Sequence, residues 1–161
     1  MCYAWCMANK IRIITTGKLH DKLFEAAILE YTKRLSPYVK IEWKILPPKT
    51  EATILQTIAS ESNATLACLK EAEKVILLDE HGTQFSSIEF SNLLLTSLAT
   101  SKDVSLVIGG AYGVSDQLKA RANTIVSFGK MVLPHQLMRV VLIEQLYRSF
   151  MIAKGSDYHH D

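Results

Sequence analysis

The chain has 161 residues, of which 48% are hydrophobic and 21% charged, and its formal net charge is +2. This length predicts a single domain, and the composition excludes disordered and collagen-like chains. No apolar run reaches the roughly 18 residues that a membrane-spanning helix needs, and the N-terminus lacks the pattern of a signal peptide, so we expect a cytoplasmic protein that binds no membrane.

The cysteines and the first residues need an interpretation of their own. Three cysteines, at positions 2, 6 and 68, are too few for a disulfide framework. Cys2 and Cys6 have no second Cys or His pair at zinc-finger spacing, so we expect no metal site. The segment that begins at Met7 is typical of a natural chain start, and residues 1–6 are therefore expected to be a disordered or non-native extension.

The hydrophobic pattern alternates between strands and helices along the chain. β-Branched and apolar runs predict strands over residues 10–16, 39–46, 74–78, 104–108 and 124–128. Apolar residues at helical spacing predict helices over residues 21–35, 51–69, 86–98, 115–122 and 134–154. Ser86 and Glu89 form a capping box, and residues 79–84 are expected to be a loop. The alternation predicts one α/β domain, residues 1–161, with a mostly parallel sheet.

The apolar positions of the second predicted helix are Ile54, Leu55, Ile58, Leu66 and Leu69. The last predicted helix is apolar nearly all round, which indicates that it is buried on several sides. A helix of this kind in so small a chain is typical of a two-fold subunit interface, and the alternative is the central helix of a monomer.

Ligands of open α/β sheets bind at the carboxyl ends of the strands. Three such ends carry acidic residues or glycine: DEHG at 79–82, GGAYG at 109–113 and GKMVLP at 129–134. Glycine there lets the backbone approach a ligand closely, although a Gly-Gly pair is also typical of a tight turn. The sequence has no P-loop, G-x-G-x-x-G or G-x-S-x-G motif, so we expect neither a P-loop NTPase, a Rossmann dinucleotide enzyme nor a serine hydrolase.

Several segments of the sequence carry a specific family resemblance. The strongest are VSLVIGGAYGVS (104–115), KMVLPHQLMRVVLIEQLYRSF (130–150) and DYHHD (157–161), and LLDEHGTQFSSIEF (77–90) and IRIITTGKLHD (11–21) agree with earlier blocks. From Met7 onward the chain resembles the bacterial ribosomal large-subunit pseudouridine methyltransferase H family of the SPOUT superfamily. Ala111 departs from the proline of many members, which changes the stiffness of that loop.

This resemblance implies a SPOUT fold with a deep C-terminal trefoil knot, a homodimer, and S-adenosylmethionine as cofactor. It also implies a set of cofactor-binding positions at the three strand ends that the residues themselves single out. By matching positions, these are Leu78, Gly110, Gly129, Lys130, Met131, Val132, Leu133 and Pro134.

The implied reaction is methylation of N3 of a pseudouridine in 23S rRNA, preferably on assembled ribosomes. The nitrogen must lose a proton, and His159 is the candidate acceptor because imidazole titrates near neutrality. Tyr158 is the candidate for holding or stacking on the base. Both belong to the tail, residues 156–161, which in a dimer could complete the partner's site; taken alone, the same residues are typical of a frayed terminus.

Basic residues offer further candidates for contact with rRNA, and no DNA partner is expected. His135, Arg139 and Arg148 lie on the last predicted helix, where Arg139 could contact phosphate or the partner chain and Arg148 could anchor the tail. Each of the three has a structural role as its alternative. Residues 1–50 carry nine Lys or Arg against four Asp or Glu, and the candidates among them for phosphate contact are Lys10, Arg12, Lys18 and Lys22.

Two other functions stay open at this point. One is a related methyltransferase that acts on another RNA base. The other is a non-catalytic dimer that binds RNA or the ribosome.

Overall fold

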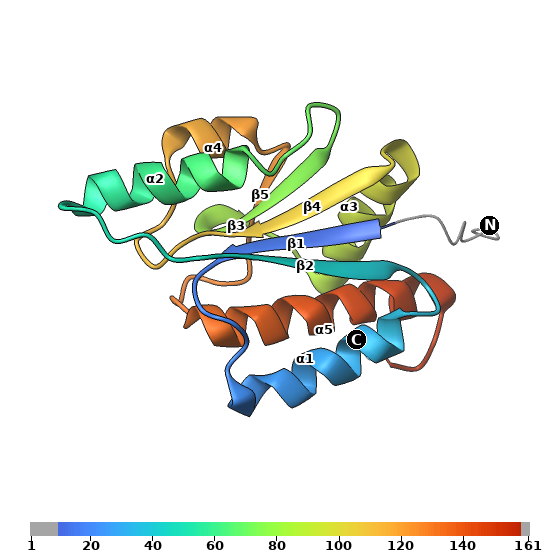
Figure 1. Ribbon diagram of the computed structural model, residues 1–161. Coiled ribbons are helices and arrows are strands. Elements are labelled where there is room, and N and C mark those ends of the chain that lie inside the picture. The colour runs from blue at the N-terminus through green and yellow to red at the C-terminus, as the bar shows by residue number, and fades with distance from the viewer. Residues whose placement is uncertain (1–9, 159–161) are drawn as a thin grey trace.

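The computed structural model describes residues 10–158, which form three layers with a sheet in the middle (Figure 1). The sheet has five strands in the order β2-β1-β4-β3-β5, and every neighbouring pair is parallel. The strands are β1 (Lys10–Thr16), β2 (Lys40–Leu46), β3 (Lys74–Gln84), β4 (Asp103–Ile108) and β5 (Thr124–Ser127). The predicted parallel α/β domain is therefore confirmed.

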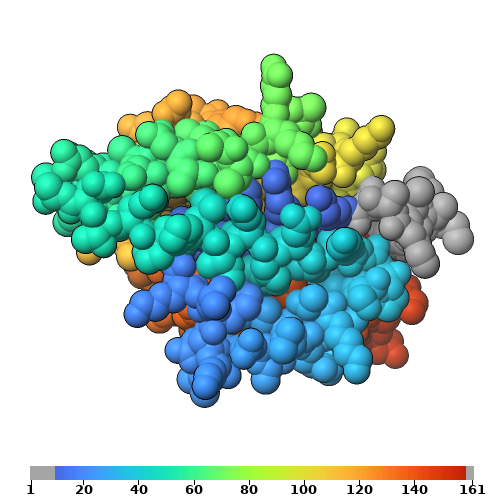
Figure 2. All heavy atoms as spheres, viewed as in Figure 1, coloured from blue at the N-terminus to red at the C-terminus, as the bar shows by residue number. Residues whose placement is uncertain are grey.

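Five helices cover the two faces of the sheet. They are α1 (Lys22–Leu35), α2 (Ile54–Leu66), α3 (Ser87–Thr100), α4 (Asp116–Arg121) and α5 (His135–Lys154). Helices α2 and α4 pack on one face, and α1, α3 and α5 pack on the other (Figure 1). Figure 2 shows β2 and α1 covering one side of the molecule, with the start of α2 projecting at one end.

The core follows the alternation of side chains along the strands. Ile13 of β1 and Leu106 of β4 are fully buried against α1, α3 and α5. Ile14 and Val107, one residue further along each strand, are buried on the opposite face with α2 and α4. Strands covered on both faces read as continuous apolar runs, which explains why the sequence indicates them so clearly.

Helix α5 lies between α1 and α3, and no residue from His135 to Ala153 is exposed. Much of its apolar surface is thus buried within one chain, as is expected for the central helix of a single subunit. The helix ends at Gly155, whose left-handed backbone (φ 68°) lets its N–H bond to the carbonyls of the last turn.

Two predicted elements were wrong in their limits. The segment 79–84 is not a loop but a continuation of β3, because after a register shift Thr83 and Gln84 pair with Val126 and Ser127 of β5. Helix α2 begins at Ile54 rather than at residue 51, because the Thr53 side chain accepts a bond from the Gln56 N–H and caps the helix there.

The buried face of α2 is polar, which the sequence did not indicate. Its buried residues are Thr57, Glu61, Ser62 and Thr65. In contrast, the side chains of Ile54 and Leu55 are exposed. The polar face is buried because neighbouring loops bring backbone N–H groups that need acceptors: Ser62 Oγ accepts from Ser115 and Glu61 Oε1 accepts from Lys49.

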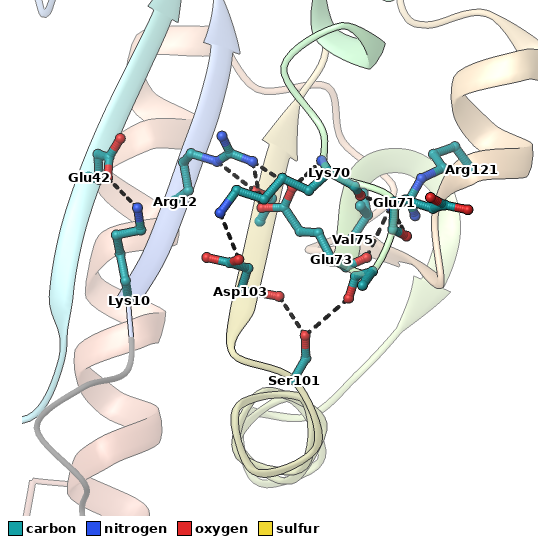
Figure 3. A network of polar contacts seen from close by, with 12 residues as sticks. Lys10, Arg12, Glu42, Lys70, Glu71, Glu73, Val75, Ser101, Asp103 and Arg121 are labelled. Carbon is teal, nitrogen blue, oxygen red and sulfur yellow. Dashed lines mark hydrogen bonds and ion pairs between the residues drawn. The ribbon is translucent and has the colours of Figure 1, made fainter.

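A polar network joins the amino ends of β1, β3 and β4 (Figure 3). Arg12 donates two bonds to the buried carboxylate of Glu73, at 2.7 and 2.5 Å, and Ser105 donates a third. Arg121 donates to the carbonyl groups of Lys70, Glu71 and Glu73. The network fixes the connection from α2 to β3 against the sheet.

This arrangement corrects one expectation about the basic residues. Lys10 and Arg12 lie at the amino end of β1, whereas Lys18 and Lys22 follow its carboxyl end, so the four do not form one cluster. Lys10 forms an ion pair with Glu42 at 2.9 Å, and Arg12 forms an ion pair with Glu73. Within residues 10–158, no helix is long and apolar enough to cross a membrane.

Candidate functional site

A cavity of about 390 Å³ lies beside the middle of β3 and at the carboxyl ends of β4 and β5. Its walls come from Leu78, Asp79 and Glu80 within β3, from the segments that follow β4 and β5, and from the first turns of α5. Apolar side chains form much of the lining: Leu78, Ile108, Val126, Phe128, Leu133 and Met138. A concave apolar site with a few polar groups at the carboxyl ends of parallel strands is typical of small-molecule binding.

The structure brings together six of the eight residues that the resemblance singled out. They are Leu78, Gly110, Gly129, Met131, Val132 and Leu133. Met131 and Val132 line the mouth of the cavity with side chains that are 80% and 79% exposed. Lys130 and Pro134 belong to the same segment, but they are not among the lining residues.

Gly110 is the point of closest approach in the cavity wall. A Cβ atom added there would lie 1.9 Å from Oε2 of Glu61 on α2. A side chain at position 110 would therefore require the Glu61 carboxylate to move. Sequence reasoning missed Glu61, although the spacing of Thr57, Glu61 and Thr65 places three polar residues on one face of α2.

His135 begins α5 and lines the cavity. Its Nδ1 atom is buried and has no hydrogen-bond partner in the described part of the chain. Burial lowers the pKa of His135 below its usual value, and the positive charge of Arg139 lowers it further, so the ring is neutral near pH 7. A neutral imidazole with a free ring nitrogen can donate to or accept from a ligand.

Arg139 is not a surface residue, contrary to the expectation that it contacts phosphate or a partner chain. Its side chain is only 1% exposed, and Nη1 donates to the carbonyl oxygen of Lys18 at 2.9 Å. Its Nε is buried without a partner among residues 10–158. Arg139 therefore joins the β1–α1 loop to the start of α5, and burial lowers its pKa.

Tyr158, the last described residue of the tail, packs against the second half of α5. The Tyr158 hydroxyl donates to Glu144 at 3.1 Å, and the Arg148 guanidinium lies 4.9 Å from the centre of the Tyr158 ring. Burial raises the pKa of Tyr158, and the bond with Tyr31 and the charge of Glu144 raise it further. Arg148 thus contacts the tail as expected. Tyr158 is not among the residues that line the cavity, and His159 lies outside the described residues.

An acidic group stands at one side of the cavity. Asp79, Glu80 and His81 each place one possible metal-ligand atom within 4.8 Å of the others. Asp79 already pairs with Lys119 at 3.3 Å and accepts from the His81 N–H at 2.9 Å. Burial raises the pKa of Asp79, but these bonds outweigh it and the net shift is downward. We assign no metal here, and Cys2 and Cys6 lie outside the described residues.

Comparison with known protein families shows to which class of protein the chain belongs. A family model described as "Predicted SPOUT methyltransferase" matches residues 9–159, which is nearly the whole chain. A solved structure described as a probable methylase family protein from Haemophilus influenzae Rd KW20 shares the fold, with a TM-score of 0.59 and 11% identity over 96% of this chain and 72% of that chain.

Curated relatives narrow the class to one family. The Ribosomal RNA large subunit methyltransferase H of Streptococcus sanguinis is 46% identical over 157 residues, 93% of this chain and 99% of the relative. The proteins of that name from Latilactobacillus sakei and Caldicellulosiruptor saccharolyticus are 46% and 38% identical, over 92% of this chain and 98% and 99% of theirs. The chain belongs to the ribosomal RNA large subunit methyltransferase H family.

The cofactor of this family of SPOUT methyltransferases is S-adenosylmethionine. The cavity fits such a group, because its lining combines apolar side chains with polar groups and with the backbone at Gly110 and Gly129. A lining of this kind is typical of small-molecule and cofactor sites.

Proposed function

We propose that the protein methylates N3 of a pseudouridine in 23S rRNA of the assembled ribosome, acting as a cytoplasmic homodimer. The observation that carries this proposal is the glycine-walled cavity beside β3 and at the ends of β4 and β5, in a chain that belongs to this family over nearly its full length.

The proposed cofactor set is the one that the resemblance implied, with Leu78, Gly110 and residues 129–134. S-adenosylmethionine supplies an activated methyl group, so the protein's task is to align the acceptor nitrogen and to help it lose its proton. The backbone at Gly110 and residues 129–134 would hold the cofactor, and the apolar walls would exclude water from it.

We also propose a deep trefoil knot and a role for the tail across the dimer. Support for the second comes from the position of Tyr158, which packs on α1 and α5 away from the cavity of its own chain. In the proposed dimer the tail would reach a neighbouring subunit's site, where Tyr158 and His159 would contact the target base. Leu19, Leu23, Met131 and Val132 are exposed apolar residues that a partner subunit would cover.

The decisive experiment offers labelled S-adenosylmethionine and the protein to unmethylated ribosomes, free large subunits and naked rRNA. We expect one N3-methylpseudouridine on ribosomes, identified by mass spectrometry of the product nucleoside. A different methylated nucleoside would favour the related enzyme acting on another base. Cofactor binding with no transfer to any of the three would favour the non-catalytic binding protein.

A further inference from the structure

A second cavity, of about 200 Å³, adjoins the cofactor cavity. The two share Gly110, Ala111 and His135, so they meet at the loop after β4 and the first turn of α5. Charged residues of both signs, from three segments of the chain, line the second cavity. Glu61 comes from α2, Lys18 from the β1–α1 loop and Arg139 from α5.

Glu61 presents one free oxygen to this region. The residue is only 7% exposed, and its Oε1 accepts the Lys49 N–H at 3.1 Å. Its Oε2 faces Gly110 and accepts no hydrogen bond from residues 10–158. Because this oxygen keeps its lone pairs free of protein donors and Glu61 lines the cavity, it can accept a hydrogen bond from a ligand that supplies an N–H or O–H group.

Residues that can donate hydrogen bonds line the same cavity as Glu61. Arg139 is almost fully buried and keeps its Nε without a partner among residues 10–158. His135, one helical turn before it, has a buried ring nitrogen without a partner in that part of the chain, and Lys18 adds a second cationic side chain. The cavity therefore combines one carboxylate acceptor with several possible donors.

The imide edge of a uracil-type base has the complementary pattern, an N3–H between two carbonyl oxygens. We propose that the second cavity receives this edge of the target base and that Glu61 is the catalytic residue that accepts the N3 proton. This inference rests on the proposed function and places proton transfer on α2 of the cofactor-binding chain, leaving the tail to hold the base.

The step balances. The N3–H bond breaks and its proton passes to Glu61 Oε2. The nitrogen electron pair forms the bond to the methyl carbon while the carbon–sulfur bond breaks, and that pair remains on sulfur. The protonated carboxyl group then releases its proton to water. No other reactant is needed.

Glu61→Gln tests the assignment in the full-length protein. The amide oxygen can still accept from Lys49 and the side-chain volume is kept, so folding should be preserved. We expect the dissociation constants of S-adenosylmethionine and S-adenosylhomocysteine, measured by calorimetry, to change by less than about twofold. The single-turnover rate of methyl transfer to ribosomes should fall about 100-fold or more. Glu51→Gln, on an exposed residue before α2, is the matched control.

The pH dependence of the rate distinguishes a proton acceptor from a residue with a purely structural role. The imide ionises by itself in alkaline solution and then needs no acceptor, so the rate of the Glu61→Gln variant should recover in part as pH rises. If Gln impairs folding, as judged by the melting temperature, Glu61→Asp keeps the carboxylate. It should then retain more activity than Glu61→Gln at equal folded fraction.

Three results would overturn the inference. An unchanged rate with unchanged cofactor affinity would mean that Glu61 only supports the Lys49 loop. A tenfold or greater loss of cofactor affinity, with the rate at saturation kept, would assign the carboxylate to the cofactor's ammonium group. A wild-type protein that methylates no imide nitrogen would remove the proposed function itself, and the inference with it, whatever the variant does.

Discussion

Gly110 is the residue at which one added methyl group should matter most. The nearest atom to its added Cβ is the buried Glu61 carboxylate, so Gly110→Ala must displace either the loop after β4 or that side chain. We expect calorimetry to show cofactor affinity reduced about tenfold, or about 1.4 kcal/mol. The double variant Gly110→Ala/Glu61→Ala removes the collision and should recover most of the affinity. Full affinity in the single variant would place the cofactor elsewhere.

Buried charges at this site depend on partners from distant parts of the chain. Nη1 of Arg139 donates to the Lys18 carbonyl, and Oε1 of Glu61 accepts the Lys49 N–H. Neither partner is a helical neighbour, so the residue patterns of α2 and α5 do not reveal them. Local sequence patterns therefore predict a surface position for Arg139 and do not single out Glu61.

At the scale of elements, the Glu73 network fastens the α2–β3 connection to β1 and β4. Removing one partner of a buried ion pair leaves the other charge uncompensated, which costs more than losing an exposed pair. Glu73→Ala should therefore lower the free energy of unfolding by about 3 kcal/mol, measured by urea denaturation.

Glu42 provides the matched control for Glu73. It pairs with Lys10 on the neighbouring strand, but both side chains are substantially exposed, at 45% and 35%. Glu42→Ala should cost only about 0.5 kcal/mol. Equal losses in the two variants would show that the Glu73 network does not stabilise the fold beyond a surface ion pair.

At the scale of the whole molecule, the tail and the dimer are expected to act together. Light scattering should give a mass of about twice 18.0 kDa, since a two-fold dimer is the commonest assembly. Deletion of residues 157–161 should leave this mass and the cofactor affinity unchanged but reduce turnover about 100-fold. Tyr158→Phe keeps the ring beside Arg148 but loses the bond to Glu144, and should have the smaller effect.

Two outcomes would contradict this arrangement. A mass near 18.0 kDa would exclude the dimer. Full activity after the deletion would show that the tail is only a frayed end.

The sequence by itself determined the element order, the parallel α/β class and three chain segments that meet at the cavity. These features depend on residues that are close in the chain, such as the apolar runs of β3 and β4 and the capping box at Ser86. The family motifs predict the cofactor positions, because they too are contiguous segments.

Only the tertiary structure decided the strand order, the extension of β3 to Gln84, the polar buried face of α2 and the burial of Arg139. Each depends on a partner far away in sequence. Strand β5 pairs with the end of β3, and the backbone N–H groups of Lys49 and Ser115 donate to side chains of α2. The Lys18 carbonyl in the β1–α1 loop accepts a hydrogen bond from Arg139. A local pattern shows which residues are polar, but whether a polar group is buried depends on which distant segment satisfies it.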